Sequence, residues 1–578
     1  MSESLSQQPA YLRRMSKNIS SLSGRDGKEL DDPLWERLQK AASADGTPED
    51  RALTQIADDF LIGEAITYGT SSFYDFLKKE NQGKKAYVCN GSACLVAGTQ
   101  DKVHHELAKR FKPEEIGHMC CLGRCHENSA FNLGGLNYSG DAIDRLAEVV
   151  DAGLGVERLK VGGASSFPNM DAYHVGTSMA APILTAPMPP LPEFYAVWEQ
   201  VLKSEAVDVL NEIKTATIRG RGGAGFPMGF KLEACRNAQD TTGTGTPRKY
   251  IVCNADEGDP AAYSDRYLLE QRPHRVLLGM MIAGYCVGAD TGVLYIRAEY
   301  PEAVEIVKQA MRDLEANGWI GNDIKGSGFH WRFKVIKAAG AYVCGEESAL
   351  IESIEGRRGM PRQRPPYVAE RGLFGRPTLV NNVETLFWVP EIARRGAAWF
   401  AGQGRRGAKG VRHFSVSGRV KNPGVKLAPA GITLRELVDE FCGGMAAGHA
   451  LKGYLPGGAS GGILPASLAD LPLDFGTLRD HGCFVGSHAV VVLSDKDDMK
   501  AVALNLMKFF EHESCGQCTP CRVGTEKSVA LLARESWDAS LLDELGKTMT
   551  DASICGLGQA AANPVFSVLR FFPDDAKR

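Results

Sequence analysis

Three cysteines near the C-terminal end of the chain have the spacing of metal ligands. Cys515, Cys518 and Cys521 lie in the stretch ESCGQCTPCR, each separated from the next by two residues. Gly516 and Pro520 shape a loop in which successive thiolates turn toward one centre. This compact three-ligand run is typical of [4Fe–4S] clusters, whose fourth thiolate usually lies elsewhere in the chain.

Cys555, in the stretch ASICGLGQ, is the candidate for the fourth ligand and lies 34 residues after Cys521. The segment between them has apolar residues at helical spacing, so two helices could return the chain to the first three cysteines. A zinc site is the alternative, but zinc sites favour two paired C-x2-C knuckles and often histidine. Structural thiols without a metal are the remaining reading.

A second cysteine group lies toward the N-terminus. Cys89 and Cys94 form a C-x4-C pair, and Cys121 and Cys125 form a C-x3-C pair. Both pairs follow short apolar stretches, as expected for loops at strand ends, and four thiolates in two pairs suit a [2Fe–2S] cluster. Cys120 could compete as a ligand, and a zinc site or two disulfides are alternatives. Most of the other cysteines are expected in the core as small hydrophobes: Cys120, Cys235, Cys253, Cys286, Cys344, Cys442 and Cys483.

A glycine-rich stretch, GRGGAGFPMGFK, runs from Gly220 to Lys231. Its glycines let backbone N–H groups approach a phosphate closely, and Arg219, Arg221 and Lys231 supply positive charge. A dinucleotide fingerprint needs a strand immediately before the glycines, whereas the preceding VLNEIKTATIR favours a helix. The stretch therefore predicts a phosphate loop outside the usual dinucleotide motif, with a plain surface loop as the alternative.

Polar side chains follow an apolar strand in KYIVCNADEGDP. Asn254, Asp256, Glu257 and Asp259 come at its carboxyl end, where they could hold the hydroxyls of a ribityl or ribose group. A solvated acidic turn is the alternative. GVLYIRAEYPEAVEIVKQAMRDLEANG follows with the pattern of a strand and an amphipathic helix.

Two further stretches predict polar groups at the same edge of an α/β sheet. AYVCGEESALIESIEG predicts another strand end at Glu346 and Glu347. RPTLVNNVETL places Asn381, Asn382 and Thr385 at a junction between a loop and a helix. Several strand ends that carry polar groups indicate a ligand across the edge of the sheet.

The elements that position these residues belong to a multidomain chain of 578 residues, enough for three or four domains. The formal net charge of −4 argues against a nucleic-acid binder. The longest apolar run, VLLGMMIAGYCVGA, has 14 residues and favours a buried helix over a membrane span. The N-terminal residues lack the apolar core of a secretory signal; we expect a tail that docks on a partner, with a mitochondrial transit peptide as the alternative, and a cytoplasmic protein.

The motifs together resemble a known family. RGRGGAGFPMGFK, CNADEG, GAYVCGEESALIESIEG, NNVETL, ESCGQCTPCRVGT and CGLG resemble the NADH-oxidising flavoprotein subunit of respiratory complex I and its relatives, over roughly residues 195–575. The two N-terminal cysteine pairs resemble the thioredoxin-like [2Fe–2S] subunit of complex I, fused ahead over about residues 45–150. VKLAPAGITLRELVDE, YLPGGASGGILP and LPLDFGTL are most similar to the flavoprotein (beta, diaphorase) subunit of NAD-dependent molybdenum or tungsten formate dehydrogenases. The diaphorase of an NAD-reducing hydrogenase and a non-enzymatic electron-transfer scaffold are the alternatives.

The resemblance implies an NAD-dependent oxidoreductase with FMN, NAD, a [4Fe–4S] cluster and a [2Fe–2S] cluster. It implies no catalytic side chain in this chain, because hydride passes between FMN and NAD. For FMN it implies Gly220, Gly222, Lys231, Asn254, Asp256, Gly345, Glu346, Glu347, Asn381, Asn382 and Thr385. For NAD it implies Phe226, Asp259, Arg364 and Tyr367. For the clusters it implies Cys515, Cys518, Cys521 and Cys555 for [4Fe–4S], and Cys89, Cys94, Cys121 and Cys125 for [2Fe–2S].

The chain departs from the family at several of these positions. Asp259 stands where the family usually has Glu; a carboxylate is kept, so NAD stays preferred over NADP. Leu232 and Ala234 replace aromatic residues, so stacking on the adenine is expected to be weaker or arranged differently. Arg364 and Tyr367 take the place of Lys and Phe.

The expected fold class is α/β multidomain, and the implied partner is a Mo/W-pterin formate dehydrogenase catalytic (alpha) subunit with further iron–sulfur clusters. No nucleic acid and no membrane span are expected. The [2Fe–2S] cluster is interpreted as a side store of electrons. The expected boundaries are an N-terminal tail over 1–45, a thioredoxin-like [2Fe–2S] domain over 46–150, a Pro-rich linker over 151–189, a Rossmann-like FMN/NADH domain over 190–415, a β-grasp (ubiquitin-like, SLBB-like) domain over 416–500 and a helical bundle with the [4Fe–4S] site over 501–578.

Overall fold

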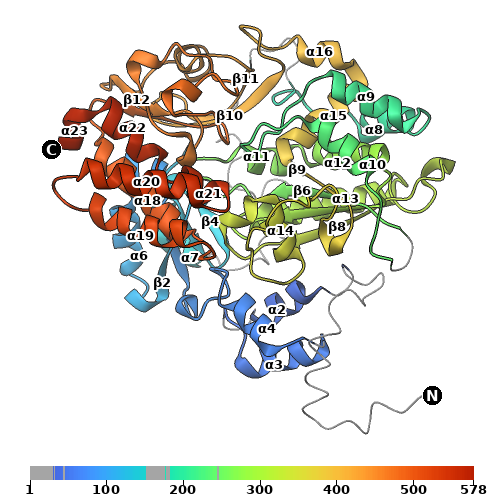
Figure 1. Cartoon of the computed structure of the whole chain (residues 1–578), viewed down its shortest axis with the longest axis horizontal. Coiled ribbons are helices and arrows are strands. Elements are labelled where there is room, and N and C mark those ends of the chain that lie inside the picture. Colours follow the sequence, from blue (N-terminus) through green and yellow to red (C-terminus); the bar gives the residue numbers. More distant parts are fainter. Residues whose placement is uncertain are drawn as a thin grey trace.

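The computed structural model describes residue 30 and residues 33–42, 46–60, 62–151, 176–177, 183–243 and 247–577. Most of the expected N-terminal tail and most of the linker expected over 151–189 lie outside these residues. In Figure 1 the N-terminal helices lie at the bottom, the Rossmann-like sheet on the right, the β-grasp strands at the top and the C-terminal helices on the left. Within the described ranges, no helix has the length and apolar character needed to cross a bilayer.

Three short helices open the described chain. They are α2 (Leu34–Ala42), α3 (Asp50–Asp59) and α4 (Glu64–Ser71). Helices α2 and α3 share a small apolar cluster, and α4 packs on α3. Helix α2 falls inside the range expected to be a tail, so ordered structure begins earlier than the sequence pattern indicated. The indole Nε1 of Trp35 donates to the carbonyl of Lys337 at 2.7 Å, which ties α2 to a distant strand end.

A four-stranded sheet follows, in the order β2-β1-β3-β4. Strand β1 is parallel to β2 and antiparallel to β3. The elements are β1 (Ala86–Cys89), α5 (Ser92–Ala97), α6 (Gln100–Ala108), β2 (Ile116–Met119), β3 (Phe131–Leu133), β4 (Leu136–Tyr138) and α7 (Leu146–Asp151). The first cysteine pair begins at the last residue of β1, and the second pair follows β2. The expectation that both pairs lie at strand ends is confirmed.

A parallel sheet of four strands forms the centre of the molecule, in the order β8-β7-β6-β9. The strands are β6 (Tyr250–Ala255), β7 (Thr291–Ile296), β8 (Arg332–Lys337) and β9 (Thr378–Asn382). The chain runs outward from β6 to β8 and then returns to β9 beside β6, so the strand order reverses between β6 and β9. Ligands of such sheets bind at this switch point, outside the carboxyl ends of the strands.

Helices surround this sheet and carry the rest of its core. They are α8 (Leu191–Val201), α9 (Ala206–Thr215), α10 (Met228–Asn237), α11 (Ser264–Gln271), α12 (Pro273–Val287), α13 (Pro301–Ala316), α14 (Glu347–Ile354), α15 (Val383–Arg395) and α16 (Ala397–Ala401). Two sequence predictions are confirmed here. The long apolar run forms α12, which is almost entirely buried, and the segment before the glycine-rich stretch forms the helix α9.

One expected strand is wrong. The stretch AYVCGEE forms a 3-10 helix, η10 (Tyr342–Gly345), and the neighbouring strand β8 ends earlier, at Lys337. The reason is local: Glu346 caps the N-terminus of α14, and its side chain accepts from the backbone N–H groups of Ser348 and Ala349. The apolar residues before it form a single turn that leads into this cap.

The β-grasp part, named after the domain expected over residues 416–500, is a six-stranded sheet in the order β13-β12-β14-β10-β11-β5. It has its own apolar core, separate from the core of the central sheet. Its strands are β5 (Gly176–Thr177), β10 (Val411–Gly418), β11 (Gly424–Pro429), β12 (Leu451–Leu455), β13 (Leu464–Pro465) and β14 (Ala489–Ser494), with the short helix α17 (Leu434–Glu436). Strand β10 begins at Val411, before residue 416, and β5 comes from the range expected to be a linker.

Helices close the chain. They are α18 (Met499–His512), α19 (Thr519–Leu532), α20 (Ala539–Ala552), α21 (Gly556–Ala560), α22 (Asn563–Phe571) and α23 (Pro573–Lys577). Helix α19 packs on both α18 and α20, and α20 packs on α21. The prediction of two helices between Cys521 and Cys555 is therefore confirmed, because α19 and α20 return the chain as expected.

Candidate functional site

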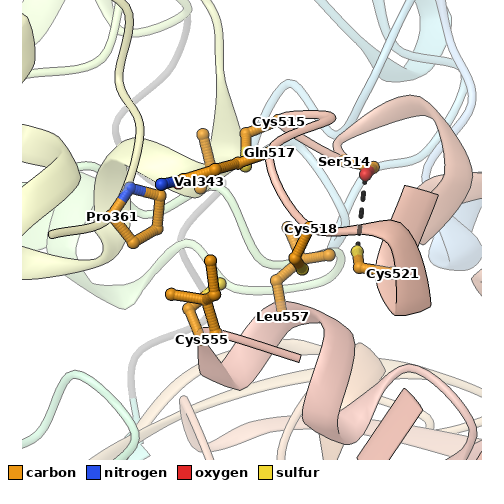
Figure 2. A pocket seen from close by; sticks show the side chains of 10 residues that line it. Val343, Pro361, Ser514, Cys515, Gln517, Cys518, Cys521, Cys555 and Leu557 are labelled. Carbon is orange, nitrogen blue, oxygen red and sulfur yellow. Dashed lines mark hydrogen bonds between the residues drawn. The ribbon is translucent and has the colours of Figure 1, made fainter. Parts of the chain in front are cut away.

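Four cysteines of the C-terminal helices line one pocket. Figure 2 shows Cys515, Cys518, Cys521 and Cys555 around a shared space, with Val343 from η10 on its other side. Cys518 is the N-cap of α19 and Cys521 lies in its first turn, whereas Cys555 is the N-cap of α21. The fourth cysteine thus reaches the other three because α20 ends beside the start of α19.

The spacing of these sulfurs distinguishes between a single ion and a cluster. Zinc binds thiolates at about 2.3 Å, so four sulfurs around one zinc lie about 3.8 Å apart. Among the described residues, the group that brings three ligand atoms within 4.8 Å of one another is Asp75, His512 and Glu513, not these cysteines. These cysteines are therefore not gathered as closely as the four sulfurs of a single zinc site, which is compatible with ligands of an iron–sulfur cluster.

The thiols of this pocket are held in a weakly polar setting. Burial raises the pKa of Cys521 to about 12, although Ser514, whose Oγ lies 3.4 Å from the sulfur, lowers it in part. Burial likewise raises the pKa of Cys555 to about 11. A cluster must displace these protons, because thiolates are the ligands of iron.

The N-terminal cysteines also meet. The Sγ atoms of Cys121 and Cys125 are 3.1 Å apart, and Cys89 interacts with both Cys94 and Cys121. All four are buried free thiols, so the structure places no disulfide among them. Cys120 is half-buried, and its thiol lies near the charges of Glu513 and Arg297; burial raises the pKa of this thiol well above the usual value.

The glycine-rich stretch forms a closed loop. The amide of Gly220 donates to the carbonyl of Phe226 at 2.8 Å, and Nε of Arg219 donates to the carbonyl of Gly225 at 2.6 Å. The amide of Arg221 donates to Oγ1 of Thr385 at 2.9 Å, which fixes the loop on the first turn of α15. A Cβ atom added at Gly222 would lie 3.3 Å from Cβ of Asn382, so a side chain there would crowd the approach to β9.

The carboxyl ends of β6 and β9 meet the start of α14. Asn254 pairs with Asn382 in register across the switch point. The side-chain amide of Asn254 donates to the carbonyl of Gly345 at 2.8 Å, and its oxygen accepts from the amide of Asp256 at 3.1 Å. Lys231 of α10 closes the group, because its Nζ donates to Glu347 and to the carbonyl of Val380, each at 2.7 Å.

Two buried polar atoms at these strand ends have no hydrogen-bond partner within the described ranges. They are Oδ2 of Asp256 and Nδ2 of Asn381. Burial raises the pKa of Asp256 well above its usual range. Because buried polar groups are almost always hydrogen-bonded, these atoms indicate a site for a ligand that carries hydroxyl or amide groups. A flavin with its ribityl chain fits this donor and acceptor set.

Two residues expected at the nucleotide, Phe226 and Tyr367, present large exposed rings, each 56% exposed. Arg364 pairs with the carboxylates of Glu346 and Glu347. Phe230, which the sequence analysis did not select, is 54% exposed on α10, with Nζ of Lys214 lying 5.3 Å from its ring centroid. Its position between Phe226 and Lys231 in the glycine-rich stretch was the available signal.

Asp259 lies in a different setting from the other expected nucleotide residues. Its Oδ1 accepts from the amide of Ala459 at 2.9 Å, and its Oδ2 accepts from Oγ of Ser487 at 2.5 Å. Burial raises the pKa of Asp259 to about 6, against the lowering effect of both hydrogen bonds. Both carboxylate oxygens are therefore engaged by loops of the β-grasp part.

Three family models match the chain. The Nuo51 FMN-binding domain covers residues 213–391, and the NADH-ubiquinone oxidoreductase-F iron–sulfur binding region covers residues 501–578. The SLBB domain covers residues 414–464, within the part described here as β-grasp. The first match includes the switch point and the glycine-rich loop, and the second includes all four cysteines of the C-terminal pocket.

The chain is similar to several relatives over much of their length. The mitochondrial NADH dehydrogenase [ubiquinone] flavoprotein 1 of Dictyostelium discoideum is 42% identical over 373 residues, which is 63% of this chain and 77% of that protein. The NADP-reducing hydrogenase subunit HndC of Solidesulfovibrio fructosivorans is 41% identical over 382 residues, 65% of this chain and 76% of that protein. A chain of an NAD+-reducing [NiFe]-hydrogenase in the H2-reduced state superposes with a TM-score of 0.81 at 30% identity, covering 96% of this chain and 92% of that one.

Proposed function

The chain belongs to the family of the NADH-oxidising, FMN-binding flavoproteins typified by NADH dehydrogenase [ubiquinone] flavoprotein 1, and from this premise we propose that it is the diaphorase subunit of an NAD-dependent formate dehydrogenase. When bound, FMN exchanges hydride with NAD and single electrons with iron–sulfur clusters, which is why a flavin stands between these two carriers. The function of this chain is to hold both carriers close together and to admit the nucleotide.

The observation that carries this proposal is the position of η10. Val343 of this short helix lines the four-cysteine pocket, and Gly345, two residues later, accepts from Asn254 at the switch point. One rigid turn thus separates the two proposed cofactor sites. The cap that Glu346 makes on α14 fixes this turn from its C-terminal side.

The residues of the switch point have distinct proposed tasks. Gly220 closes the glycine-rich loop through its own amide. The amide of Gly222 in that loop and the positive charge of Lys231 would hold the phosphate of FMN. Asn254, Asp256 and the amide of Asn381, which has no partner among the described residues, would hold the ribityl chain and the ring. The further proposed FMN contacts are Gly345, Glu346, Glu347, Asn382 and Thr385.

The nucleotide is proposed to enter over the exposed rings of Phe226 and Tyr367, with Arg364 and its carboxylate partners beside them. Aromatic rings with open faces are suitable for stacking a base or a nicotinamide. The proposed substrate is NAD, in keeping with the resemblance to NADH-oxidising subunits.

A [2Fe–2S] cluster is proposed at Cys89, Cys94, Cys121 and Cys125, because two pairs of buried thiols meet at the ends of β1 and β2. The Cys121 thiol also receives a backbone hydrogen bond from Ala261, in the acidic loop that follows β6. The contact joins the N-terminal cysteine group to the edge of the flavoprotein part, which is compatible with a side store of electrons.

Two partners remain candidates, each with its own support. The β-grasp stretches that begin at Val425, Tyr454 and Leu471 resemble the formate dehydrogenase subunit and support a Mo/W-pterin catalytic partner in the cytoplasm. The likeness of almost the whole chain to a chain of an NAD+-reducing [NiFe]-hydrogenase supports a nickel-containing partner as the second candidate.

Purification of the native complex under anaerobic conditions tests this choice. We expect molybdenum or tungsten together with iron by elemental analysis, and reduction of NAD+ that depends on formate. Nickel with hydrogen-dependent reduction of NAD+ would assign the chain to a hydrogenase. In both cases we expect one FMN per chain and NADH-driven reduction of an artificial acceptor. If both were absent, the chain would be assigned the role of a non-enzymatic electron-transfer scaffold.

A further inference from the structure

The ring of Phe475 lies close to two guanidinium groups from different parts of the molecule. Cζ of Arg219, from the glycine-rich loop, is 4.6 Å from the ring centroid, and Cζ of Arg412, from β10, is 4.1 Å from it. A cation over the face of an aromatic ring is attracted to that ring, and the attraction is stronger where water is partly excluded. Phe475 belongs to the β-grasp stretch LPLDFGTL, to which the proposed function assigns no task.

The same ring fills the space beside Gly225. This glycine has φ of +64°, and a Cβ atom added to it would approach Cδ1 of Phe475 to 2.5 Å. Real Cβ atoms do not come that close, so glycine is needed here for both its conformation and its lack of a side chain. The carbonyl of this residue accepts from Arg219, so the ring contacts the loop where Arg219 closes it.

Buried polar groups hold Phe475 in position. Arg412 pairs with Asp474 and contacts Nε2 of His488 at 2.6 Å, and the amide of Phe475 donates to Oδ1 of Asp474 at 2.8 Å. Arg412 is 1% exposed and His488 is 1% exposed, so this support is inside the protein. The ring therefore contacts the loop while buried hydrogen bonds and an ion pair hold its own segment in place.

The loop is joined to the same domain at a second point. The guanidinium of Arg221 donates to the carbonyl of Arg219 at 3.1 Å and to the carbonyl of Val411, the first residue of β10, at 3.0 Å. Two residues thus hold the glycine-rich loop from different sides. Phe475 contacts it from the β-grasp domain, and Thr385 contacts it from α15.

We propose that Phe475 is a positioning residue that holds the glycine-rich loop, residues 219–227, in the shape that receives FMN and the nicotinamide nucleotide. The inference rests on the proposed function of that loop. It assigns to the β-grasp domain a task in cofactor binding that acts through the glycine-rich loop.

Phe475→Leu tests the inference in the intact complex, since leucine keeps apolar volume and removes the aromatic face. We expect FMN to dissociate about tenfold faster, measured by the rise in fluorescence of released flavin, because two cation–π contacts are lost. KM for NADH should rise by a similar factor with a smaller change in kcat. Phe475→Tyr, which keeps the ring, should restore both values.

The matched control is Phe441→Leu, in the core of the same domain. It weakens the β-grasp core without touching the loop, so it should lower the thermal midpoint while leaving the rate of FMN release near the wild-type value. Equal effects of Phe475→Leu and Phe441→Leu on FMN release would overturn the inference, because they would reduce the role of Phe475 to general stability.

A double-mutant cycle isolates the contact itself. Gly225→Ala alone should accelerate FMN release, because its Cβ collides with the ring. Adding Phe475→Ala removes the collision, so the double variant should release FMN more slowly than the sum of the two single effects predicts. Strict additivity would show that the ring does not act on the loop. A wild-type complex that holds no FMN would instead contradict the proposed function.

Discussion

At the scale of the residue, Glu384 shows how a buried charge joins two domains. Its Oε1 lies 3.6 Å from Nε of Arg221 and 3.1 Å from Nδ1 of His413, and it accepts from the amide of His413 at 3.0 Å. Burial alone would raise the pKa of this carboxyl, but His413, Arg221 and His488 lower it to about 2. Glu384 is thus the anion that compensates the charge of Arg221 in the glycine-rich loop.

Replacement of Glu384 by glutamine should destabilise the protein at pH 7. The amide still accepts hydrogen bonds, but Arg221 loses its buried counter-charge. A carboxyl whose folded pKa is lowered contributes stability above its unfolded pKa, and that contribution is lost as pH falls from about 4.5 to about 2. The shift corresponds to about 3 kcal/mol. Thermal midpoints measured from pH 7 downward should therefore converge for variant and wild type.

The control for this series is Glu193→Gln, at an exposed position of α8. It should follow the wild type at every pH. A difference between Glu384→Gln and wild type that stays constant down to pH 2 would show that the lost stability does not come from the carboxylate charge.

At the scale of the element, the acidic loop after β6 is fixed by the β-grasp loops. Both oxygens of Asp259 accept from that domain, from Ala459 and Ser487. Gly458 is held next to it, since a Cβ there would come within 1.9 Å of Oδ2 of Asp259. The contacts of Asp259 therefore fix the position of the acidic loop.

Asp259→Asn should change the ratio of kcat/KM for NAD to kcat/KM for NADP by less than about twofold. This change corresponds to less than about 0.4 kcal/mol. Asparagine keeps one acceptor for Ala459 and removes a buried charge. Because burial raises the pKa of Asp259 from 3.8 to about 6, the wild type loses stability as pH rises through that range, and the variant lacks this loss. Ratios of kcat/KM for the two nucleotides and thermal midpoints at pH 4 and 7 measure both effects. A strong gain of activity with NADP would contradict this prediction. It would indicate that Asp259 contacts the nucleotide directly.

At the scale of the whole molecule, the N-terminal cysteine loop docks on the C-terminal helices. Oδ1 of Asn505, on α18, accepts from Oγ of Ser92 at 3.0 Å, and its Nδ2 donates to the carbonyl of Asn90 at 3.2 Å. Arg419 of the β-grasp part donates to the carbonyl of Val96 at 2.5 Å. The proposed [2Fe–2S] site is thus held against two other domains.

Asn505→Ala should loosen this docking. Two hydrogen bonds are lost, each contributing about 0.5–1.5 kcal/mol, so amide exchange in residues 89–97 should accelerate by up to about a hundredfold. Hydrogen exchange followed by mass spectrometry measures this segment directly. Lys508→Ala, at an exposed position of the same helix, is the matched control. Unchanged exchange in Asn505→Ala would show that α18 does not retain the cysteine loop.

The parts of this protein that depend on local spacing could be predicted from the sequence. The cysteine run at Cys515, the distant Cys555 and the polar ends of two strands were all visible, because ligand spacing and helical periodicity are properties of short segments. One local pattern failed: the turn at Tyr342–Gly345 has the composition of a strand, and only the cap made by Glu346 ends it as a 3-10 helix.

Only the tertiary structure decided what joins these parts. Asp259 lies 200 residues from Ala459 and 228 from Ser487 in the chain, and no pattern near it indicates that these groups bind its oxygens. Phe475 is likewise an ordinary loop residue until the fold places it beside Gly225. Contacts between domains depend on how separate cores pack together, and local sequence periodicity carries no information about that packing.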